Sequence, residues 1–142
     1  IDYVIKTYEK IISKNNISIK FNKTDNFKII GDRDKLIEIF TNLIDNSIKY
    51  SDKNKEITIT AKKDGEYNTV SVADQGIGIP KESIHRITER FFTVDPSKSR
   101  SVGGTGLGLA IVKHLVSQHR AEMDINSIEN KGTTIDIKFN PL

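Results

Sequence analysis

Hydrophobic residues recur along this chain with two spacings, and each spacing predicts one kind of secondary structure. Apolar positions three or four residues apart predict a helix over residues 2–14, a long helix that opens at Asp32, and a helix over roughly 105–119. Asp32 is a suitable N-cap for the long helix. Alternation of apolar and polar positions predicts strands. The expected strands are residues 17–21, 26–30, 57–61, 67–73, 122–127 and 133–138.

The strands come in consecutive pairs, so strands that are neighbours in the sequence are expected to pair. Asp64-Gly65 is a hairpin signal, and Asn130-Lys131-Gly132 separates the last two strands. We expect residues 17–21 and 26–30 to pair in the same way. The chain therefore predicts a two-layer α/β sandwich, in which helices cover one face of a mixed, mostly antiparallel sheet. A doubly wound parallel sheet is excluded, because it needs single strands that alternate with helices.

Composition narrows the class of protein. A length of 142 residues fits one domain. No apolar run approaches the roughly 20 residues of a membrane helix, and the absence of cysteine excludes disulfides and thiolate metal sites. The net charge, 22 − 19 = +3, is too small to indicate nucleic-acid binding. Because the chain starts at Ile1 without an initiator Met or a signal pattern, we interpret it as part of a longer protein.

Six of the nine glycines lie in two loops, and this concentration points to a ligand. They are Gly76 and Gly78 in the first loop, and Gly103, Gly104, Gly106 and Gly108 in the second. The second loop runs into a helix, whose N-terminal amides suit a phosphate group. The spacing matches neither the P-loop nor the dinucleotide fingerprint. A flexible loop before a glycine-tolerant helix start is the alternative interpretation.

Polar side chains on the long helix are a second candidate. Asn42, Asn46 and Lys49 share one face of that helix. Amide oxygens suit Mg²⁺, and an ammonium group suits a phosphate. An ordinary exposed face is the alternative. Asp74 ends the strand 67–73, where its carboxylate can accept a hydrogen bond from a ligand amino group or simply cap a turn.

Five segments, taken together and in this order, resemble the sequence boxes of sensor histidine kinases. They are residues 42–50 for the N box, 74–79 for the G1 box, 89–92 for the F box, 104–110 for the G2 box and 132–134 for a final glycine-threonine box. The chain thus resembles the histidine-kinase branch of the Bergerat-type ATPases, which also include gyrase and the chaperone Hsp90. Thr88-Glu89-Arg90-Phe91 and Ser99-Arg100 make it most similar to the phosphate-regulon sensor kinases.

The resemblance implies a site for ATP and Mg²⁺ between the long helix and a mobile lid, residues 93–104. Asp74 would bind the adenine amine, with Gly78 letting the base approach, and Asn46 would bind the metal with Asn42 beside it. The implied catalytic residues are Asn42, Lys49 and Arg100, the last standing in for a lid arginine that is Thr93 here. The implied cofactor-binding residues are Asn46, Lys49, Tyr50, Asp74, Gly76, Gly78, Ile79, Phe91, Gly104, Thr105, Gly106, Leu107, Gly108, Leu109 and Thr133.

Two aromatic residues precede this lid. Phe91 and Phe92 are interpreted as a hydrophobic hinge that docks the lid when nucleotide is bound. Two such aromatics before a loop are more often part of a core than contacts to a ligand.

Position 42 separates the branches of this superfamily. The ATPase branches carry a general-base Glu there, whereas Asn42 cannot accept a proton from water near neutral pH. The resemblance therefore implies transfer of the phosphoryl group to an external histidine, with little ATP hydrolysis by this domain alone. His85, His114 and His119 lack the acidic residue that follows the phosphoacceptor histidine in the family.

The acceptor is expected on a separate dimerisation and histidine phosphotransfer domain upstream. Residues 1–14 are expected to continue from that domain, and residues 15–142 to form the catalytic and ATP-binding domain. A response regulator receiver domain is the second expected partner, with no nucleic acid. The full-length protein is expected to be a homodimer anchored in the inner membrane, with this domain cytoplasmic and monomeric alone. The alternative is a degenerate nucleotide-binding or scaffolding module, which the changed residues Thr88 and Thr93 motivate.

Overall fold

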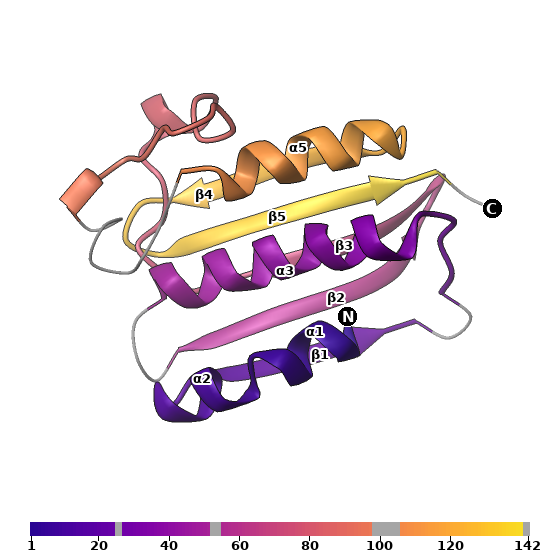
Figure 1. Ribbon diagram of the computed structural model, residues 1–142, viewed down its shortest axis with the longest axis horizontal. Helices are drawn as coiled ribbons and strands as arrows, with labels where there is room; N and C mark the ends of the chain where they lie inside the picture. Colours follow the sequence, from indigo (N-terminus) through magenta and orange to yellow (C-terminus); the bar gives the residue numbers. More distant parts are fainter. Residues whose placement is uncertain (25–26, 52–54, 98–105, 141–142) are drawn as a thin grey trace.

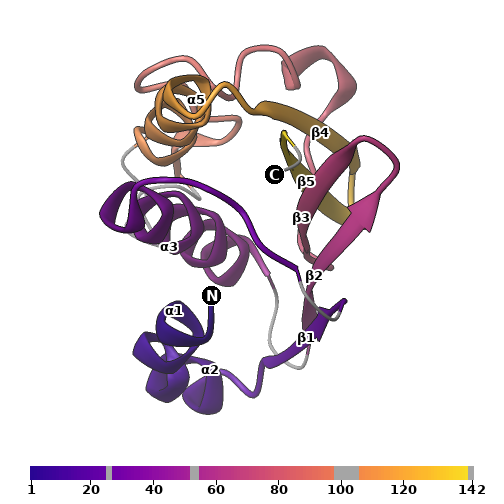
Figure 2. The same cartoon turned by 90° about the vertical axis from the view of Figure 1, so that its right-hand side faces the viewer.

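The computed structural model describes residues 1–24, 27–51, 55–97 and 106–140, and places a layer of helices on one sheet (Figure 1). A quarter turn shows α1, α2, α3 and α5 on the same face of that sheet (Figure 2). The elements in chain order are α1 (Asp2–Thr7), α2 (Glu9–Lys14), β1 (Ser18–Lys23), α3 (Arg33–Tyr50), β2 (Glu56–Asp64), β3 (Tyr67–Ala73), the 3₁₀ helix η1 (Lys81–Ser83), α5 (Gly108–Gln118), β4 (Glu122–Ile128) and β5 (Gly132–Phe139). The predicted two-layer α/β sandwich is confirmed.

The five strands have the order β1-β2-β3-β5-β4. The pairs β2–β3, β3–β5 and β4–β5 are antiparallel, and β1–β2 is parallel. The sheet is therefore mixed and mostly antiparallel, as expected. Ala73, the last residue of β3, is opposite Thr134 near the start of β5. This register brings Asp74 next to Thr133, although the two residues are far apart in the sequence.

The pairing of residues 17–21 with 26–30 was a wrong prediction. β1 pairs instead with β2, and Ser18 is opposite Glu56. A parallel pair needs a crossover connection, and here α3 supplies it. Residues 27–30 do not form a strand, while 25–26 lie outside the described residues. The side-chain amide of the buried Asn68 instead donates to the carbonyl oxygen of Lys28 at 3.1 Å, which holds this segment against β3.

The helix expected over residues 2–14 is interrupted at Tyr8. Tyr8 has φ −95° and ψ 6°, and its N–H bonds to the carbonyl oxygen of Ile5, which closes α1 before α2 begins. Val4 of α1 is only 1% exposed and belongs to the same core as α3. Residues 1–14 therefore pack on the domain, and their continuation from an upstream domain stays a prediction.

The N-cap predicted for α3 is confirmed. The Asp32 side chain accepts a hydrogen bond from the Lys35 N–H at 3.0 Å. A second link reaches the same end of α3 from α5, because His119 Nε2 accepts the Asp32 N–H at 3.1 Å. His119 Nδ1 lies 2.8 Å from the Leu115 carbonyl oxygen, so each ring nitrogen has a backbone partner. The start of α3 is thus tied to the end of α5.

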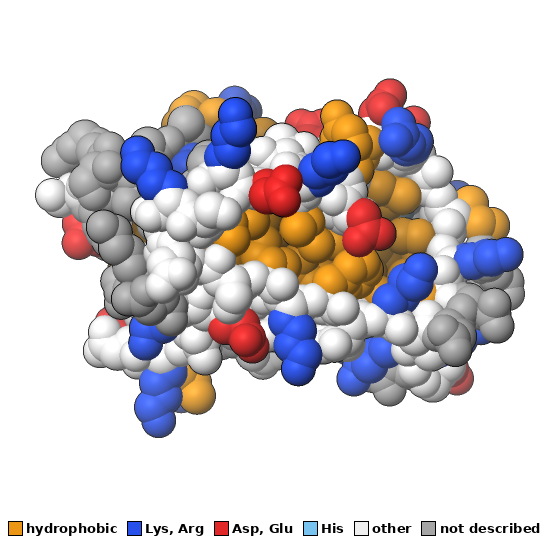
Figure 3. Space-filling view, turned by 90° about the horizontal axis from the view of Figure 1, so that it is seen from below, with side chains coloured by type: hydrophobic (Ala, Val, Ile, Leu, Met, Phe, Trp, Pro, Cys, Tyr) orange, Lys and Arg blue, Asp and Glu red, His pale blue; other side chains and the backbone are white. Residues whose placement is uncertain are grey.

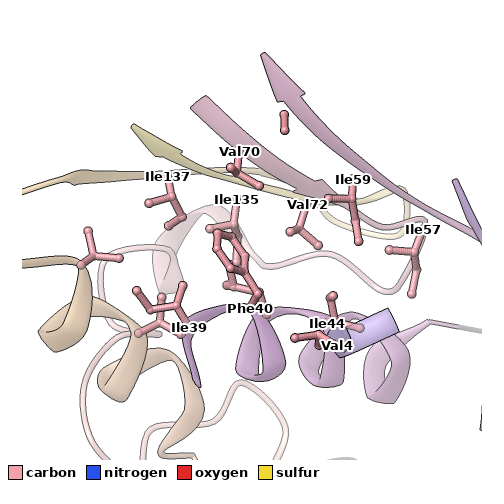
Figure 4. Close-up of a cluster of buried hydrophobic side chains, with 14 of the residues drawn as sticks. Val4, Ile39, Phe40, Ile44, Ile57, Ile59, Val70, Val72, Ile135 and Ile137 are labelled. Atoms are coloured by element: carbon pink, nitrogen blue, oxygen red, sulfur yellow. The ribbon is translucent and has the colours of Figure 1, made fainter. Parts of the chain in front are cut away.

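The core lies between α3 and the inner face of the sheet. Ile39, Leu43 and Ile44 of α3 are almost completely buried there. Figure 4 shows Ile39 and Ile44 facing side chains from β2, β3 and β5. The strand residues drawn opposite them are Ile57, Ile59, Val70, Val72, Ile135 and Ile137. Burial of each such side chain contributes about 1.5–3 kcal/mol, so this layer fixes α3 and the ends of the strands relative to each other.

The edge formed by α1, α2 and β1 shows apolar surface. Seen from below, hydrophobic side chains gather in a hollow that charged side chains surround (Figure 3). Ile19 and Phe21 of β1 are only half-buried, since the short helices cover the edge strand incompletely. Across the described ranges, no helix combines the length and the apolar character needed to cross a membrane.

Candidate functional site

A cavity of about 300 Å³ lies between the C-terminal half of α3, the ends of β3 and β5, and the start of α5. It brings together most of the residues that the sequence analysis singled out. Those that line it are Asn42, Asn46, Lys49, Tyr50, Asp74, Gly78, Ile79, Phe92, Thr93, Gly106, Leu107, Gly108, Leu109 and Thr133. Segments separated by most of the chain length thus converge on one pocket.

A few of the expected residues are placed elsewhere. Gly76 does not line the cavity; a Cβ on it would lie 2.3 Å from the carbonyl oxygen of Tyr50, so glycine is needed for close packing against α3. Phe91 is also outside the lining and is 67% exposed. Arg100, Gly104 and Thr105, like most of the expected lid, lie outside the described residues.

Asp74 is the carboxylate of this pocket. Its Oδ1 accepts two backbone hydrogen bonds, from the Gly76 N–H at 2.9 Å and the Thr133 N–H at 3.2 Å. Burial raises the pKa of Asp74 above its usual value, while these two bonds and one from the Ser47 side chain lower it in part. The side chain therefore has a fixed orientation and is a hydrogen-bond acceptor in the lining of the pocket.

The first glycine loop packs against the turn between β4 and β5. Gly78 has φ +71°, and a Cβ there would lie 2.2 Å from the carbonyl oxygen of Ile128. The Asn130 N–H donates to the Ile77 carbonyl oxygen at 2.6 Å in the same contact. Gly78 therefore has a packing role in addition to the ligand approach expected for it.

Ser127 supports this loop, and sequence reasoning did not identify it. Its hydroxyl accepts the Ile79 N–H at 2.8 Å and donates to the Gly132 carbonyl oxygen at 3.0 Å. It also lies 2.8 Å from the Thr133 hydroxyl. In the sequence Ser127 is an ordinary position of an alternating strand, and no motif marks it.

The helix α3 forms the opposite wall. The Asn42 side-chain amide donates to the Glu38 carbonyl oxygen at 3.0 Å. Its Oδ1 is then directed toward α5, because it lies 3.5 Å from the position that a Cβ on Gly108 would occupy. Asn42 thus presents an acceptor oxygen to the pocket, and its place beside a metal ion stays a prediction.

Asp45 also lines the pocket, although sequence reasoning did not identify it. Its carboxylate forms an ion pair with Lys49 at 2.8 Å. Burial raises the pKa of Tyr8 to about 12, and the charge of Asp45 and a hydrogen bond with it add to this rise. The residue that interrupts the N-terminal helices therefore contacts the carboxylate that positions Lys49.

The two phenylalanines differ in their surroundings. Phe92 lines the pocket, and the Arg86 guanidinium lies 4.5 Å from the centre of its ring. Phe91 has a left-handed backbone, with φ 66°, and its N–H bonds to the Gly106 carbonyl oxygen at 2.8 Å. The Phe91 backbone thus fixes the start of the α5 segment while its ring points away from the cavity.

The fold and the pocket define an α/β domain in which Asp74, just after β3, and the asparagines of α3 line one cavity. Residues 31–142 match the family described as histidine kinase-, DNA gyrase B-, and HSP90-like ATPase, and the chain belongs to this family.

Two curated relatives are sensor kinases. SenX3 of Mycolicibacterium smegmatis is 37% identical over 131 residues, which cover 92% of this chain and 34% of SenX3. The phosphate regulon sensor PhoR of Pseudomonas aeruginosa is 43% identical over 111 residues, which cover 78% of this chain and 25% of PhoR. The chain thus spans between a quarter and about a third of the length of these relatives. The predicted likeness to sensor histidine kinases is confirmed, with a phosphate-regulon sensor among the relatives.

Solved histidine kinase structures share the fold. The nucleotide-free catalytic domain of ThkA has a TM-score of 0.84 and 28% identity, and covers 98% of this chain and 88% of its own. Full-length ShkA in complex with AMPPNP has a TM-score of 0.83 at 25% identity, and the match covers 97% of this chain and 28% of the ShkA chain. ThkA in complex with the response regulator TrrA has a TM-score of 0.81 at 25% identity, and the match covers 99% of this chain and 39% of the ThkA chain.

Proposed function

We propose that this domain binds ATP together with Mg²⁺ and transfers the γ-phosphoryl group to a histidine on a separate dimerisation domain. The observation that carries this proposal is the half-buried Asp74, whose Oδ1 is held by two backbone N–H groups in the lining of a 300 Å³ cavity. A fixed carboxylate among apolar side chains suits an adenine ring with an exocyclic amine.

Other residues of the cavity lining fit the triphosphate. Leu107 and Gly108 begin α5, where backbone N–H groups of the first turn lack helical partners and attract phosphate oxygens. Asn46 and Asn42 line the facing wall and would hold Mg²⁺ through their side-chain oxygens. When bound, the ion neutralises the negative charge that the phosphates carry during transfer. Lys49, oriented by Asp45, supplies a further positive charge there.

The acceptor is a side chain rather than water. Activation of water needs a general base, and the side-chain amide of Asn42 cannot act as one. In phosphoryl transfer to an imidazole nitrogen, the bond between the γ-phosphorus and the bridging oxygen breaks and ADP leaves, so positioning and charge stabilisation suffice. We expect the histidine on the protein's own dimerisation domain, and therefore a homodimeric full-length kinase.

The relatives support the wider assignment. ShkA was solved with AMPPNP, an ATP analogue, and ThkA with a response regulator. We propose that a response regulator receiver domain takes the phosphoryl group from the phosphorylated histidine. We also propose that this domain is cytoplasmic in a kinase anchored in the inner membrane.

Calorimetric titration with a non-hydrolysable ATP analogue, with and without Mg²⁺, tests the site. Asp74→Asn is expected to keep the fold, because asparagine retains an oxygen for the two backbone donors. It is expected to weaken binding about tenfold, since a charge-assisted hydrogen bond becomes a neutral one. Asp34→Asn, an exposed change in the first turn of α3, is the matched control. Equal affinities of the Asp74→Asn variant and the wild type would overturn the assignment of Asp74.

Phosphotransfer needs a second assay. The domain is mixed with a dimerisation domain from a related sensor kinase, and acid-labile phosphohistidine is measured. Transfer that is lost in Asn46→Ala, with little ATP turnover by the domain alone, is the expected result. Rapid ATP hydrolysis without a partner would contradict the proposal, and nucleotide binding without any transfer would favour the degenerate module.

A further inference from the structure

A second concave surface lies on the other side of residues 84–88 from the nucleotide pocket. Ile87 lines the pocket, whereas Ile84, His85 and Thr88 line this groove. The groove has a volume of about 620 Å³ and is bounded by this segment, the C-terminal half of α5 and strand β4. Its apolar lining residues are Ile84, Val116, Ala121, Met123 and Ile125. The site is independent of the nucleotide pocket.

The edge of this groove is positively charged. Lys113 of α5 and Arg120, which follows the helix end at His119, both line this groove, and His85 lines it from the segment 84–88. Among the described residues, Asp124 is the one carboxylate of the lining, and Lys138 already binds it at 2.8 Å. An anionic partner would therefore meet the positive charges of Lys113 and Arg120 beside an apolar surface.

Arg120 occupies a backbone position that favours glycine. The Ala121 N–H bonds to the Val116 carbonyl oxygen and the Arg120 N–H to that of Ser117, which is the Schellman arrangement at the end of α5. This arrangement requires a left-handed residue, and Arg120 has φ 53°. Glycine would satisfy the same backbone bonds without the cost of a side chain there. The backbone geometry at the end of α5 therefore does not explain why position 120 is arginine rather than glycine. A role for the Arg120 guanidinium in the groove does explain it.

We propose that this groove docks an acidic amphipathic segment of a partner protein. Aliphatic side chains of that segment would contact Met123 and Ile125, while its carboxylates would bind Arg120 and Lys113. The apolar lining favours a protein segment over a nucleic-acid backbone, which has no aliphatic groups to bury there. A concave surface is also a poor match for a flat bilayer. The proposal does not rest on the proposed kinase function.

The chain offers a direct probe of this groove, because Met123 is its one methionine. With ¹³C-methyl methionine the domain gives one methyl signal, which reports occupancy of the groove. The ligand is a short synthetic peptide with leucines at helical spacing and Asp or Glu elsewhere. A peptide with Lys at each acidic position is the control, and the binding of an ATP analogue is measured separately on the same sample.

Two variants remove the positive charge and a third controls for it. Arg120→Gly and Lys113→Gln are each expected to raise the Kd of the acidic peptide about tenfold, the usual weight of a charge-assisted hydrogen bond. Lys20→Gln removes an exposed charge from β1, at the opposite edge of the sheet, and should leave the Kd unchanged. Arg120→Gly should also raise the midpoint of urea unfolding, because it relieves the left-handed arginine.

The outcomes are distinct. A saturable shift of the Met123 signal with the acidic peptide alone, weakened by Arg120→Gly and Lys113→Gln and not by Lys20→Gln, supports the proposal. No shift up to about 1 mM peptide, a concentration that still detects weak complexes, overturns it. The proposal is also overturned if Lys20→Gln weakens the binding of the acidic peptide as much as the other two variants do. A single-stranded oligonucleotide or phosphatidylglycerol vesicles that shift the Met123 signal more than the peptide does would overturn it as well. Loss of ATP-analogue binding alone would concern only the nucleotide pocket.

Discussion

Gly106 and Gly108 are close neighbours before and at the start of α5, yet their surroundings differ. Gly106 has φ +74°, and a Cβ on it would lie 2.8 Å from the Cα of Phe91. Gly108 is the first residue of α5, and a Cβ on it would meet the Asn42 Oδ1 at 3.5 Å, an ordinary contact. We therefore expect alanine to be tolerated at position 108 and to be disruptive at position 106.

The size of the difference follows from these two geometries. A left-handed backbone costs alanine about 1–2 kcal/mol, and displacement of the Phe91 backbone adds to it, so Gly106→Ala should destabilise by about 2–3 kcal/mol. Alanine is a better helix former than glycine by up to about 1 kcal/mol, so Gly108→Ala should leave stability unchanged or raise it by about that amount. The two variants should then differ by about 3 kcal/mol.

Urea unfolding followed by circular dichroism measures this difference, with the wild type alongside. Gly108→Ala should still bind Mg-ATP less well, because its methyl group occupies pocket space beside Asn42. The separation of the two effects is the diagnostic result: affinity falls in Gly108→Ala without a loss of stability. Equal stability of Gly106→Ala and Gly108→Ala would refute the inferred contact with Phe91.

Three further predictions concern the groups around the pocket. Because burial raises the pKa of Asp74, acidification should begin to lower the nucleotide affinity at a higher pH than it would with an ordinary aspartate. The domain should also lose stability as the pH rises from the unfolded-state pKa of Asp74 to its folded-state pKa. Urea titrations should show this slope in the wild type and not in Asp74→Asn. Absorbance titration should find a phenol with a pKa of about 12 for Tyr8, and Tyr8→Phe should lower stability by about 1 kcal/mol through loss of the bond to Asp45. Because Tyr8 has a raised pKa, its contribution is present below the unfolded-state value and is lost as pH rises through about 12. Ser127→Ala should lower stability by about 1–2 kcal/mol and weaken nucleotide binding in calorimetry, since the bond to the Ile79 N–H is removed; unchanged affinity would contradict its supporting role.

The elements whose signals are local were predictable from the sequence. Asp32 was correctly predicted to cap α3 because its side chain acts on a backbone group three residues away. The hairpin at Asp64-Gly65 joins β2 and β3 as expected, since Gly65 supplies the positive φ, +61°, that the turn needs. Asn42, Asn46 and Asp74 of the pocket lining were also predictable from the sequence, because they occur in recognisable short motifs.

Features that depend on distant partners could not be found this way. β1 pairs with β2 although α3 lies between them in the sequence. The alternation of apolar and polar residues in 17–21 does not indicate which strand lies beside them. Ser127 and Asp45 become important only through contacts made by the folded chain. Phe91 and Phe92 are identical neighbours in the sequence, and only the folded chain shows that Phe92 lines the pocket while Phe91 is exposed.

The bond between Asp74 and Thr133 joins residues 59 positions apart, and this separation has a thermodynamic consequence. Closing so long a loop costs entropy that is recovered only when β3 and β5 pair, so a partly folded chain without that pairing has no nucleotide pocket. Nucleotide would then bind the native state and not the unfolded ensemble. By mass action, a ligand at 100 times its Kd would add about 2.7 kcal/mol to the stability of the domain. A variant weakened in the core, far from the pocket, would accordingly be rescued by nucleotide.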